Sequence, residues 1–346
     1  MTIICKKIEN IKQLMALEPQ WVDLNHRVND GCIFTSPKWI TTWYDTFWQM
    51  DWHLNCLAIF RNKKLIALFP LYYQFISSGL TEKKLFLLGQ GEPDQSEVAT
   101  EYPDILIEPK EKEVVYPYFL KSYCQRKFDS IHIRAVKPNA NILEFLKVEH
   151  KLSGYQYTIN NQQWDKSLLS KNNRNRYARC KNQLAKLNSK FVWIEPQDYP
   201  IYWHQMSKYH QARWQKKHLH GAFFHQDFHQ FHHYFIEDKN NIRISALLVN
   251  EVIIAVNYYL VDKNTLYFYQ SGWNESSYDK LSPGFALHVW SIENNNKLFY
   301  DLMMGPISNT YKNKFKPFKR PLYDVHHQFK PIKHLILKVL RKIISI

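Results

Sequence analysis

Two stretches of the chain, one in each half, place short apolar runs around tight turns in the same order. The first comprises residues 57–60, a turn at 61–63 and residues 65–73, and the second comprises residues 245–249, a turn at 250–251 and residues 252–260. In both, the second run contains an Ile-Ala step and ends in Tyr-Tyr. Aliphatic and aromatic residues in such runs favour strands. The recurrence predicts the same antiparallel sheet element in each half, with a third strand at 266–270 in the second.

Helical patterns lie between these strands. Ser36 and Pro37 are typical of a helix start. A second helix is indicated by Leu169, Tyr177, Cys180, Leu184 and Leu187, which are spaced to share one face, with lysines and arginines on the others. Phenylalanines recur at helical spacing over 224–235, and Ser282-Pro283-Gly284 opens another helix. Strands mixed with helices in each half predict an α/β (α+β) fold with two lobes, 1–160 and 161–325, divided near the polar residues 160–163.

Charge and cysteine content narrow the class of protein. The net charge is +15 over 346 residues, so the chain attracts anions such as nucleic acid, anionic lipid or a phosphate-bearing substrate. The five cysteines are scattered and include no Cys-x-x-Cys pair, which favours neither disulfides nor zinc and fits a reducing cytoplasm. No run approaches the roughly 20 apolar residues that span a bilayer. We therefore expect a cytoplasmic location without a signal peptide or membrane span.

The second half contains an ordered set of motifs. Tyr267-x-Tyr269-Gln270-Ser271-Gly272 is followed by Ser282-Pro283-Gly284 and then by Tyr300-Asp301 and Tyr311-Lys312. The middle motif predicts a strand-to-helix turn whose free N–H groups and positive dipole end could hold an anion. The alternative is that these three residues only cap a helix.

Taken in order, these motifs resemble the CelD-like acyltransferases of exopolysaccharide biosynthesis, a branch of the GNAT (acyl-CoA N-acyltransferase) superfamily related to the FemABX transferases. The resemblance covers about residues 30–316. It also draws on Phe34-Thr35-Ser36-Pro37 and Glu101-Tyr102-Pro103-Asp104 in the first half, and on the basic helix and His210-Gln211-Ala212-Arg213-Trp214 in the second. The usual Gln/Arg-x-x-Gly-x-Gly/Ala loop for pyrophosphate is absent, and of its glycines only Gly284 remains, so an acyl carrier protein or an aminoacyl donor stays open beside acyl-CoA.

The resemblance implies two tandem GNAT-like lobes around a central cleft, and an acyl donor used as co-substrate without a permanently bound cofactor. It implies an amino-sugar acceptor, either a nucleotide-linked or a lipid-linked precursor of a surface polysaccharide. Ser282, Pro283 and Gly284 would bind the donor. Asp301 would take the ammonium proton, and Tyr311 would protonate the thiolate or orient the acceptor. Substrate contacts would come from five further residues, Lys312, Arg213, Trp214, Tyr102 and Asp104. Four of these residues have a plain structural alternative: a surface cap for Asp301, a core aromatic for Tyr311, a solvated charge for Lys312 and a helix-surface arginine for Arg213.

Two further patterns lie outside these motifs. His225, His229 and His233 share one helical face, but without a His-Glu-x-x-His signature we expect no metal site. Residues 326–346 form a basic amphipathic segment that would lie on an anionic membrane surface, making the protein peripheral on its inner face, or would pack on the protein's own core.

Two alternative functions stay open. One is a FemABX-like transferase that uses aminoacyl-tRNA, and nucleic acid is otherwise not expected because no nucleic-acid-binding signature is present. The other is a basic protein without catalytic activity that binds membrane or nucleic acid.

Overall fold

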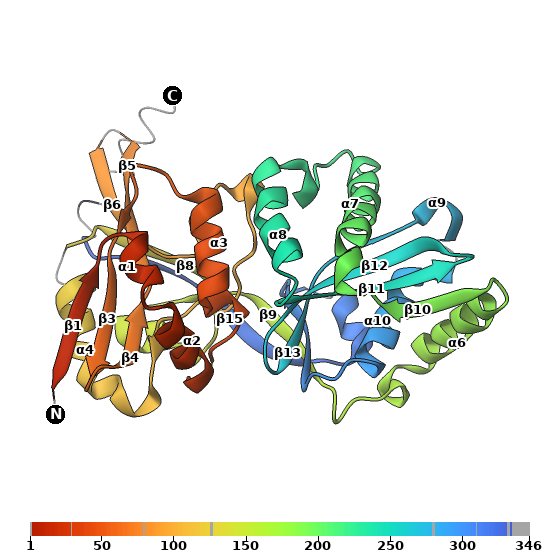
Figure 1. Ribbon diagram of the computed structural model, residues 1–346, viewed down its shortest axis with the longest axis horizontal. Coiled ribbons are helices and arrows are strands. Elements are labelled where there is room, and N and C mark those ends of the chain that lie inside the picture. Colours follow the sequence, from red (N-terminus) through yellow and green to blue (C-terminus); the bar gives the residue numbers. More distant parts are fainter. Residues whose placement is uncertain are drawn as a thin grey trace. The chain divides into compact units, whose positions relative to one another are not determined.

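The computed structural model describes residues 2–28, 30–78, 80–124, 127–278, 281–308, 310–330 and 333. The chain divides into two compact units (Figure 1). The first unit comprises Met1–Pro93, Ala99–Gly154 and Pro321–Ile346, and the second comprises Asp94–Val98 and Tyr155–Arg320. Each unit is therefore built from segments that are distant in the sequence. The short segment Asp94–Val98 belongs to the second unit, although it interrupts the first unit in the sequence.

The first unit contains two groups of hydrogen-bonded strands. One has the order β1 (Ile3–Ile8), β3 (Cys56–Arg61), β4 (Lys64–Phe69) and β7 (Leu106–Ile107), with every pair antiparallel. The other has the order β15 (Phe318–Gln328), β8 (Ser130–Val136), β6 (Leu80–Leu87), β5 (Leu71–Ser78) and β2 (His53–Leu54). Strands β6 and β8 are parallel, and the other pairs of described register are antiparallel.

The hairpin predicted at residues 57–73 is present, but its second strand is divided. Strand β4 ends at Phe69 and β5 begins at Leu71, each in a different group of strands. Pro70 lies between them and has no N–H to give to a ladder. The single strand expected over 65–73 is thus corrected to two strands that meet at a proline.

The second unit has one sheet with the order β10 (Ser189–Trp193), β11 (Ile242–Val249), β12 (Val252–Val261), β13 (Thr265–Trp273), β14 (Phe299–Gly305) and β9 (Lys151–Asn160). Only the β13–β14 pair is parallel. The three strands expected over 245–270 are confirmed as β11, β12 and β13. Each unit therefore has a mixed sheet with one parallel pair, β6–β8 in the first and β13–β14 in the second.

Helices connect and cover these strands. The first unit has α1 (Ile11–Met15), α2 (Glu18–Arg27), α3 (Pro37–Phe47), α4 (Lys112–Phe119) and α5 (Asn141–Leu146). The second has α6 (Lys171–Ala185), α7 (Tyr199–Gln215), α8 (Gln226–Asp238), α9 (Glu275–Tyr278) and α10 (Pro283–Glu293). In Figure 1, α7 and α8 lie on one face of the second unit's sheet, and α6 and α10 lie on the other.

The predicted helix starts are confirmed, and the predicted faces are confirmed except at two residues: Leu187 lies after the end of α6 and is 38% exposed, and Phe224 lies before α8 and is 56% exposed. The Ser36 hydroxyl accepts a hydrogen bond from the Trp39 N–H at the start of α3, as an N-cap should. In α6, Tyr177, Cys180 and Leu184 are the buried residues, and they join α10 in the core cluster beneath the sheet. The mixed α/β fold in two lobes is therefore as the sequence indicated.

The expected C-terminal helix lies almost entirely outside the described residues, because 331, 332 and 334–346 are not described. Strand β15 continues to Gln328, within the segment assigned to that helix. Among the described residues, no helix combines the length and the apolarity that crossing a bilayer would require.

Candidate active site

The parallel strands β13 and β14 pair over a short stretch and then separate. Their register covers Thr265 with Phe299, Leu266 with Tyr300 and Tyr267 with Asp301. Beyond these residues, β13 continues its pairing with β12, and β14 continues with β9. Helix α10 connects the two strands in the sequence. Its start packs on the end of β13, because a Cβ at Gly284 would lie 3.3 Å from the Trp273 ring.

Among the described residues, no side chain caps the start of α10, which leaves backbone donors of its first turn without an acceptor in the helix. Ser282 has φ 50° and ψ 52°, and its hydroxyl caps no backbone N–H of the helix. Pro283 has no N–H, and the N–H groups of Gly284 and Phe285 have no acceptor within the helix because they lie in its first turn. Two backbone donors and the positive dipole end therefore point out of the helix at this point.

An arginine from α6 lies at the same helix start. Arg176 donates from Nε and Nη2 to the Ser282 hydroxyl oxygen, at 2.9 and 2.6 Å, and its guanidinium lies 5.4 Å from the centre of the Phe285 ring. Sequence reasoning counted Arg176 among the polar residues of the basic helix and gave it no role. The residues involved are 106 positions apart, so only the fold brings them together.

Arg213 of α7 lies near the same place through Trp273. Its guanidinium carbon is 4.2 Å from the centre of the Trp273 ring, and its Nε lies 3.4 Å from a carboxylate oxygen of Glu275. The neighbouring Trp214 donates its indole N–H to the Nε2 of His210. The aromatic surface that Arg213 covers is thus Trp273, the residue that also contacts Gly284.

A histidine and a tyrosine line the same side of the sheet. His288 of α10 is buried, with Nδ1 2.8 Å from the Tyr300 hydroxyl, and its ring centre is 6.3 Å from that of Tyr311. Burial, aided by the charge of Lys312, lowers the pKa of His288 to about 3, so its ring is neutral near pH 7. The sequence motifs did not single out this histidine.

Tyr311 combines an exposed position with a desolvated hydroxyl. It lies in the short 3₁₀ helix η9 (Tyr311–Phe315), and 46% of the residue is exposed. Desolvation around the hydroxyl raises the pKa of Tyr311 to about 12, while the positive charge of Arg213 acts in the opposite direction. The phenol therefore keeps its proton at neutral pH, as a proton donor must.

Asp301 and Lys312 both contact the backbone of β14. Asp301 is buried and accepts hydrogen bonds from the Gln156 Nε2 and from the Met303 N–H, each at 2.6 Å. Lys312 donates from Nζ to the carbonyl oxygens of Met303 and Met304. These contacts fix the Asp301 side chain and hold the lysine beside β14.

The structure brings most of the predicted residues together in the second unit. Ser282, Pro283 and Gly284 form the start of α10, and Arg213 reaches it through Trp273. Tyr311 and Lys312 connect to the same helix through His288.

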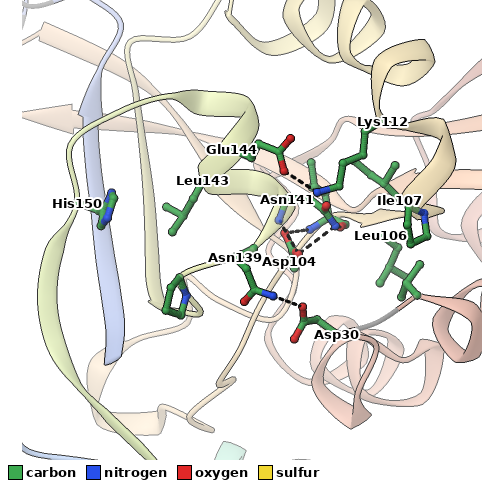
Figure 2. Close-up of a pocket in the computed structure, with 15 residues that line it drawn as sticks. Asp30, Asp104, Leu106, Ile107, Lys112, Asn139, Asn141, Leu143, Glu144 and His150 are labelled. Atoms are coloured by element: carbon green, nitrogen blue, oxygen red, sulfur yellow. Dashed lines mark hydrogen bonds and ion pairs between the residues drawn. The ribbon is translucent and has the colours of Figure 1, made fainter. Parts of the chain in front are cut away.

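Tyr102 and Asp104 belong to the first unit, where Asp104 lines a pocket of about 470 Å³ (Figure 2). The carboxylate of Asp104 accepts four hydrogen bonds, from the N–H groups of Ile105, Asn141 and Ile142 and from the Asn141 side chain. Tyr102 is buried, with a φ of 57°, and does not line the pocket. Asp104 thus holds the start of α5 in place.

Other groups line this pocket without converging on a shared centre. Figure 2 shows Lys112 paired with Glu144 and Asn139 bonded to Asp30, at 2.5 and 3.0 Å. Burial raises the pKa of Asp104 to about 7 against the effect of its backbone donors, and the charge of Asp30 adds to the rise.

The histidine-rich segment is divided among separate contacts. His229 contacts the carbonyl oxygen of Phe223 at 2.8 Å, and His233 lies 3.0 Å from Glu237. Within the described ranges, no group of three or more His, Cys, Asp or Glu side chains has an arrangement that could hold a metal ion.

The comparison with known proteins agrees with this arrangement. Residues 171–313 match the family model of an acetyltransferase (GNAT) domain. The matched segment begins at α6 and ends in η9, and so includes both arginines, the start of α10 and Lys312. No curated protein matches the sequence.

Solved structures share the fold over nearly the whole chain. The crystal structure of FemX is similar with a TM-score of 0.60 at 10% identity, over 96% of this chain and 100% of that chain. L-PGS from Bacillus licheniformis has a TM-score of 0.52 at 13% identity, over 88% of this chain and 96% of that one. A C-terminal domain of a putative lysylphosphatidylglycerol synthetase from Agrobacterium fabrum has a TM-score of 0.52 at 12% identity, over 90% and 92%. The mixed α/β fold expected from the sequence is confirmed, and it is shared with these structures over most of their length.

Proposed function

We propose that the second unit transfers an acyl group from a thioester donor to an amine. The observation that supports this most directly is the start of α10, where two backbone N–H groups and the guanidinium of Arg176 converge within the matched acetyltransferase segment. A phosphate group would find there the positive charge, the planar donors and the dipole that bind anions. The donor in this proposal is acyl-CoA or an acyl carrier protein, used as co-substrate.

The reaction forms one bond, breaks another and requires proton transfers at the amine and at the departing sulfur. The amine nitrogen attacks the thioester carbonyl carbon, an amide bond forms, and the C–S bond breaks. We assign to Asp301 the role of taking the ammonium proton, and its two hydrogen-bond donors, the Gln156 side chain and the Met303 N–H, support this role because they fix the position of the carboxylate. Tyr311, whose phenol is protonated at neutral pH, would give its proton to the departing thiolate and take back the proton that the amine nitrogen loses as the amide forms.

We further propose that the acceptor is an amino sugar, a nucleotide-linked or lipid-linked precursor of a surface polysaccharide. The resemblance to CelD-like enzymes supports this acceptor. Arg213 over Trp273 offers the planar charge and aromatic surface that a sugar phosphate would use.

Two alternatives follow from the same fold. The likeness to FemX supports an aminoacyl donor on tRNA, and the positive charge supports binding to membrane or nucleic acid without catalysis. All five cysteines are free thiols, which supports the proposed cytoplasmic location, with the C-terminal segment as the proposed contact to an anionic membrane surface.

The test is a panel of acyl-CoA, acyl-carrier and aminoacyl-tRNA donors against nucleotide amino sugars, read by thiol release for the thioesters and by amide product for all. Amide product from a thioester donor is the expected result. Product from aminoacyl-tRNA alone would replace the proposal with the first alternative. No product and no donor binding by calorimetry would leave the non-catalytic reading.

A further inference from the structure

Helix α6 carries an exposed surface that is positively charged and contains no acid. Its sequence has five lysines and arginines and no Asp or Glu, and the most exposed of these are Lys171, Arg174, Arg179 and Lys181. Between them lie exposed asparagines and a glutamine. The surface is a concentrated part of a chain whose net charge is +15. We call these four residues the basic surface.

The apolar face of α6 is used inside the protein. Tyr177, Cys180 and Leu184 are buried in the core cluster with α10, so they cannot insert into a lipid bilayer. Helices that lie on membranes present an apolar face for insertion beside their cations. The basic surface lacks that face, and its partner is therefore a polyanion in solution.

Two exposed leucines distinguish a protein partner from a nucleic acid. Leu168 and Leu187 lie just before and just after α6, and they are 46% and 38% exposed. Protein interfaces combine apolar contacts with charged groups at the rim, whereas contacts with single-stranded nucleic acid use aromatic stacking. The exposed residues of α6 include no aromatic side chain. Cations between two apolar contacts fit an acidic protein surface.

The basic surface is connected to the start of α10 by one residue. Arg176 lies on α6 among the exposed cations and bonds to Ser282 at the start of α10. A helix of 15 residues is about 22 Å long at 1.5 Å per residue, comparable to one helix of a small partner. A partner held along α6 would thus lie beside the place where the thioester donor is proposed to bind.

We infer that the basic surface of α6 docks an acidic carrier protein, which delivers the acyl group on a phosphate-linked arm to the start of α10. This rests on the proposed function and names the partner that supplies its donor. The carrier's acidic residues contact the lysines and arginines, and Leu168 and Leu187 contact apolar residues beside them. Such attraction speeds association and weakens with added salt.

The test compares one acyl group on two donors, a purified acidic acyl carrier protein and CoA. The variant replaces Lys171, Arg179 and Lys181 by Glu, and a single Arg179→Glu variant guards against misfolding of the triple. The control carries Glu at three cations on other elements of the second unit, the exposed Lys208, Lys239 and Lys263. Both triple variants make the same change in net charge. A thermal melt checks that each variant folds.

The expected result is a larger rise in KM for the carrier-borne donor than for the CoA-borne donor. The α6 triple variant raises KM for the carrier-borne donor at least tenfold more than KM for the CoA-borne donor, and Arg179→Glu does so by a smaller factor. The control variant leaves that ratio within twofold of the parent. Raising the salt concentration reproduces the rise in KM for the carrier with the parent protein and not with the α6 variant.

Other outcomes overturn the inference. Equal effects on both donors would mean that α6 acts on the shared phosphate arm, and loss of tRNA binding alone would assign the surface to RNA. If the protein turns over the CoA-borne donor but not the carrier-borne donor, the docking is rejected while the proposed function stands. If no donor is turned over, the proposed function fails, and fluorescence anisotropy with labelled holo-carrier still decides the docking: binding lost in the α6 variant supports it, and no binding rejects it.

Discussion

Replacing Arg176 by Met should weaken donor binding without removing the catalytic groups. In the structure this side chain makes two charged hydrogen bonds to Ser282, at 2.9 and 2.6 Å, and holds that residue at φ 50°. A hydrogen bond to a charged group contributes about 1.5–3 kcal/mol, and a left-handed residue other than glycine costs about 1–2 kcal/mol. Methionine keeps an unbranched side chain against Phe285 but provides neither donor nor charge.

The lost binding free energy concerns the start of α10, where the donor is proposed to bind. We therefore expect KM for the donor to rise. Removing one cation from a bound phosphate corresponds to about 1.5–3 kcal/mol, which is roughly a 10-fold to 150-fold rise in KM. The turnover number should change by less than about threefold, because no group that moves a proton is touched. Lys208→Met, an exposed helix cation in the same unit, is the control.

The assay is continuous detection of released thiol over a range of donor concentrations at fixed acceptor. A second variant, Ser282→Ala, separates the two effects of the arginine: it removes the hydrogen-bond acceptor and keeps the charge. We expect a smaller rise in KM from it than from Arg176→Met. A donor KM within twofold of the parent in Arg176→Met would refute the assignment of this residue to the donor site.

Three further predictions follow from contacts in the second unit. Asp301→Asn should lower turnover by about 100-fold, as for a positioned base, and should also lower the melting temperature, because an amide N–H would face the donor Gln156; unchanged kinetics would remove Asp301 from the reaction. Gly272→Ala should cost at least about 3 kcal/mol of unfolding free energy in urea, since the new Cβ would lie 2.3 Å from a backbone oxygen of α7, whereas Ser271→Ala should cost under about 1 kcal/mol. His288 has a pKa of about 3 in the folded protein against an ordinary 6.5, so the unfolded chain takes up this proton first as the pH falls. The free energy of unfolding therefore decreases between about pH 6.5 and pH 3, by up to about 1.4 kcal/mol per pH unit. His288→Gln should flatten this dependence of stability on pH relative to the exposed-residue control His204→Gln, and equal dependence in the two variants would contradict this origin of the acid sensitivity.

Local pattern was enough to predict a set of strands and helices in each half of the chain. The strands at 245–249, 252–260 and 266–270, the capped start of α3 and the buried face of α6 all depend on neighbouring residues in the sequence, and all are present. The division at Pro70 was missed because the apolar run continues across it. A proline in a strand ends its ladder even where the hydrophobic pattern does not change.

The contacts that form the candidate site could not be predicted in the same way. Arg176 and Ser282 are 106 residues apart, and nothing near either residue indicates the other. Arg213 and the adjacent Trp214 were both predicted to contact the substrate, but consecutive residues on a helix point in different directions, and the ring that Arg213 covers is Trp273 on β13.

By itself, the sequence determined where several strands and helices form, which residues of α6 and α8 form most of their apolar faces, and the excess of positive charge. These properties depend on period, on capping and on composition, which are local or additive. The tertiary structure alone decided that β13 and β14 part after three register pairs, that α10 begins there, and that an arginine from α6 lies at its first turn. Those contacts depend on how distant segments pack, and the free energy of packing is a property of the whole unit.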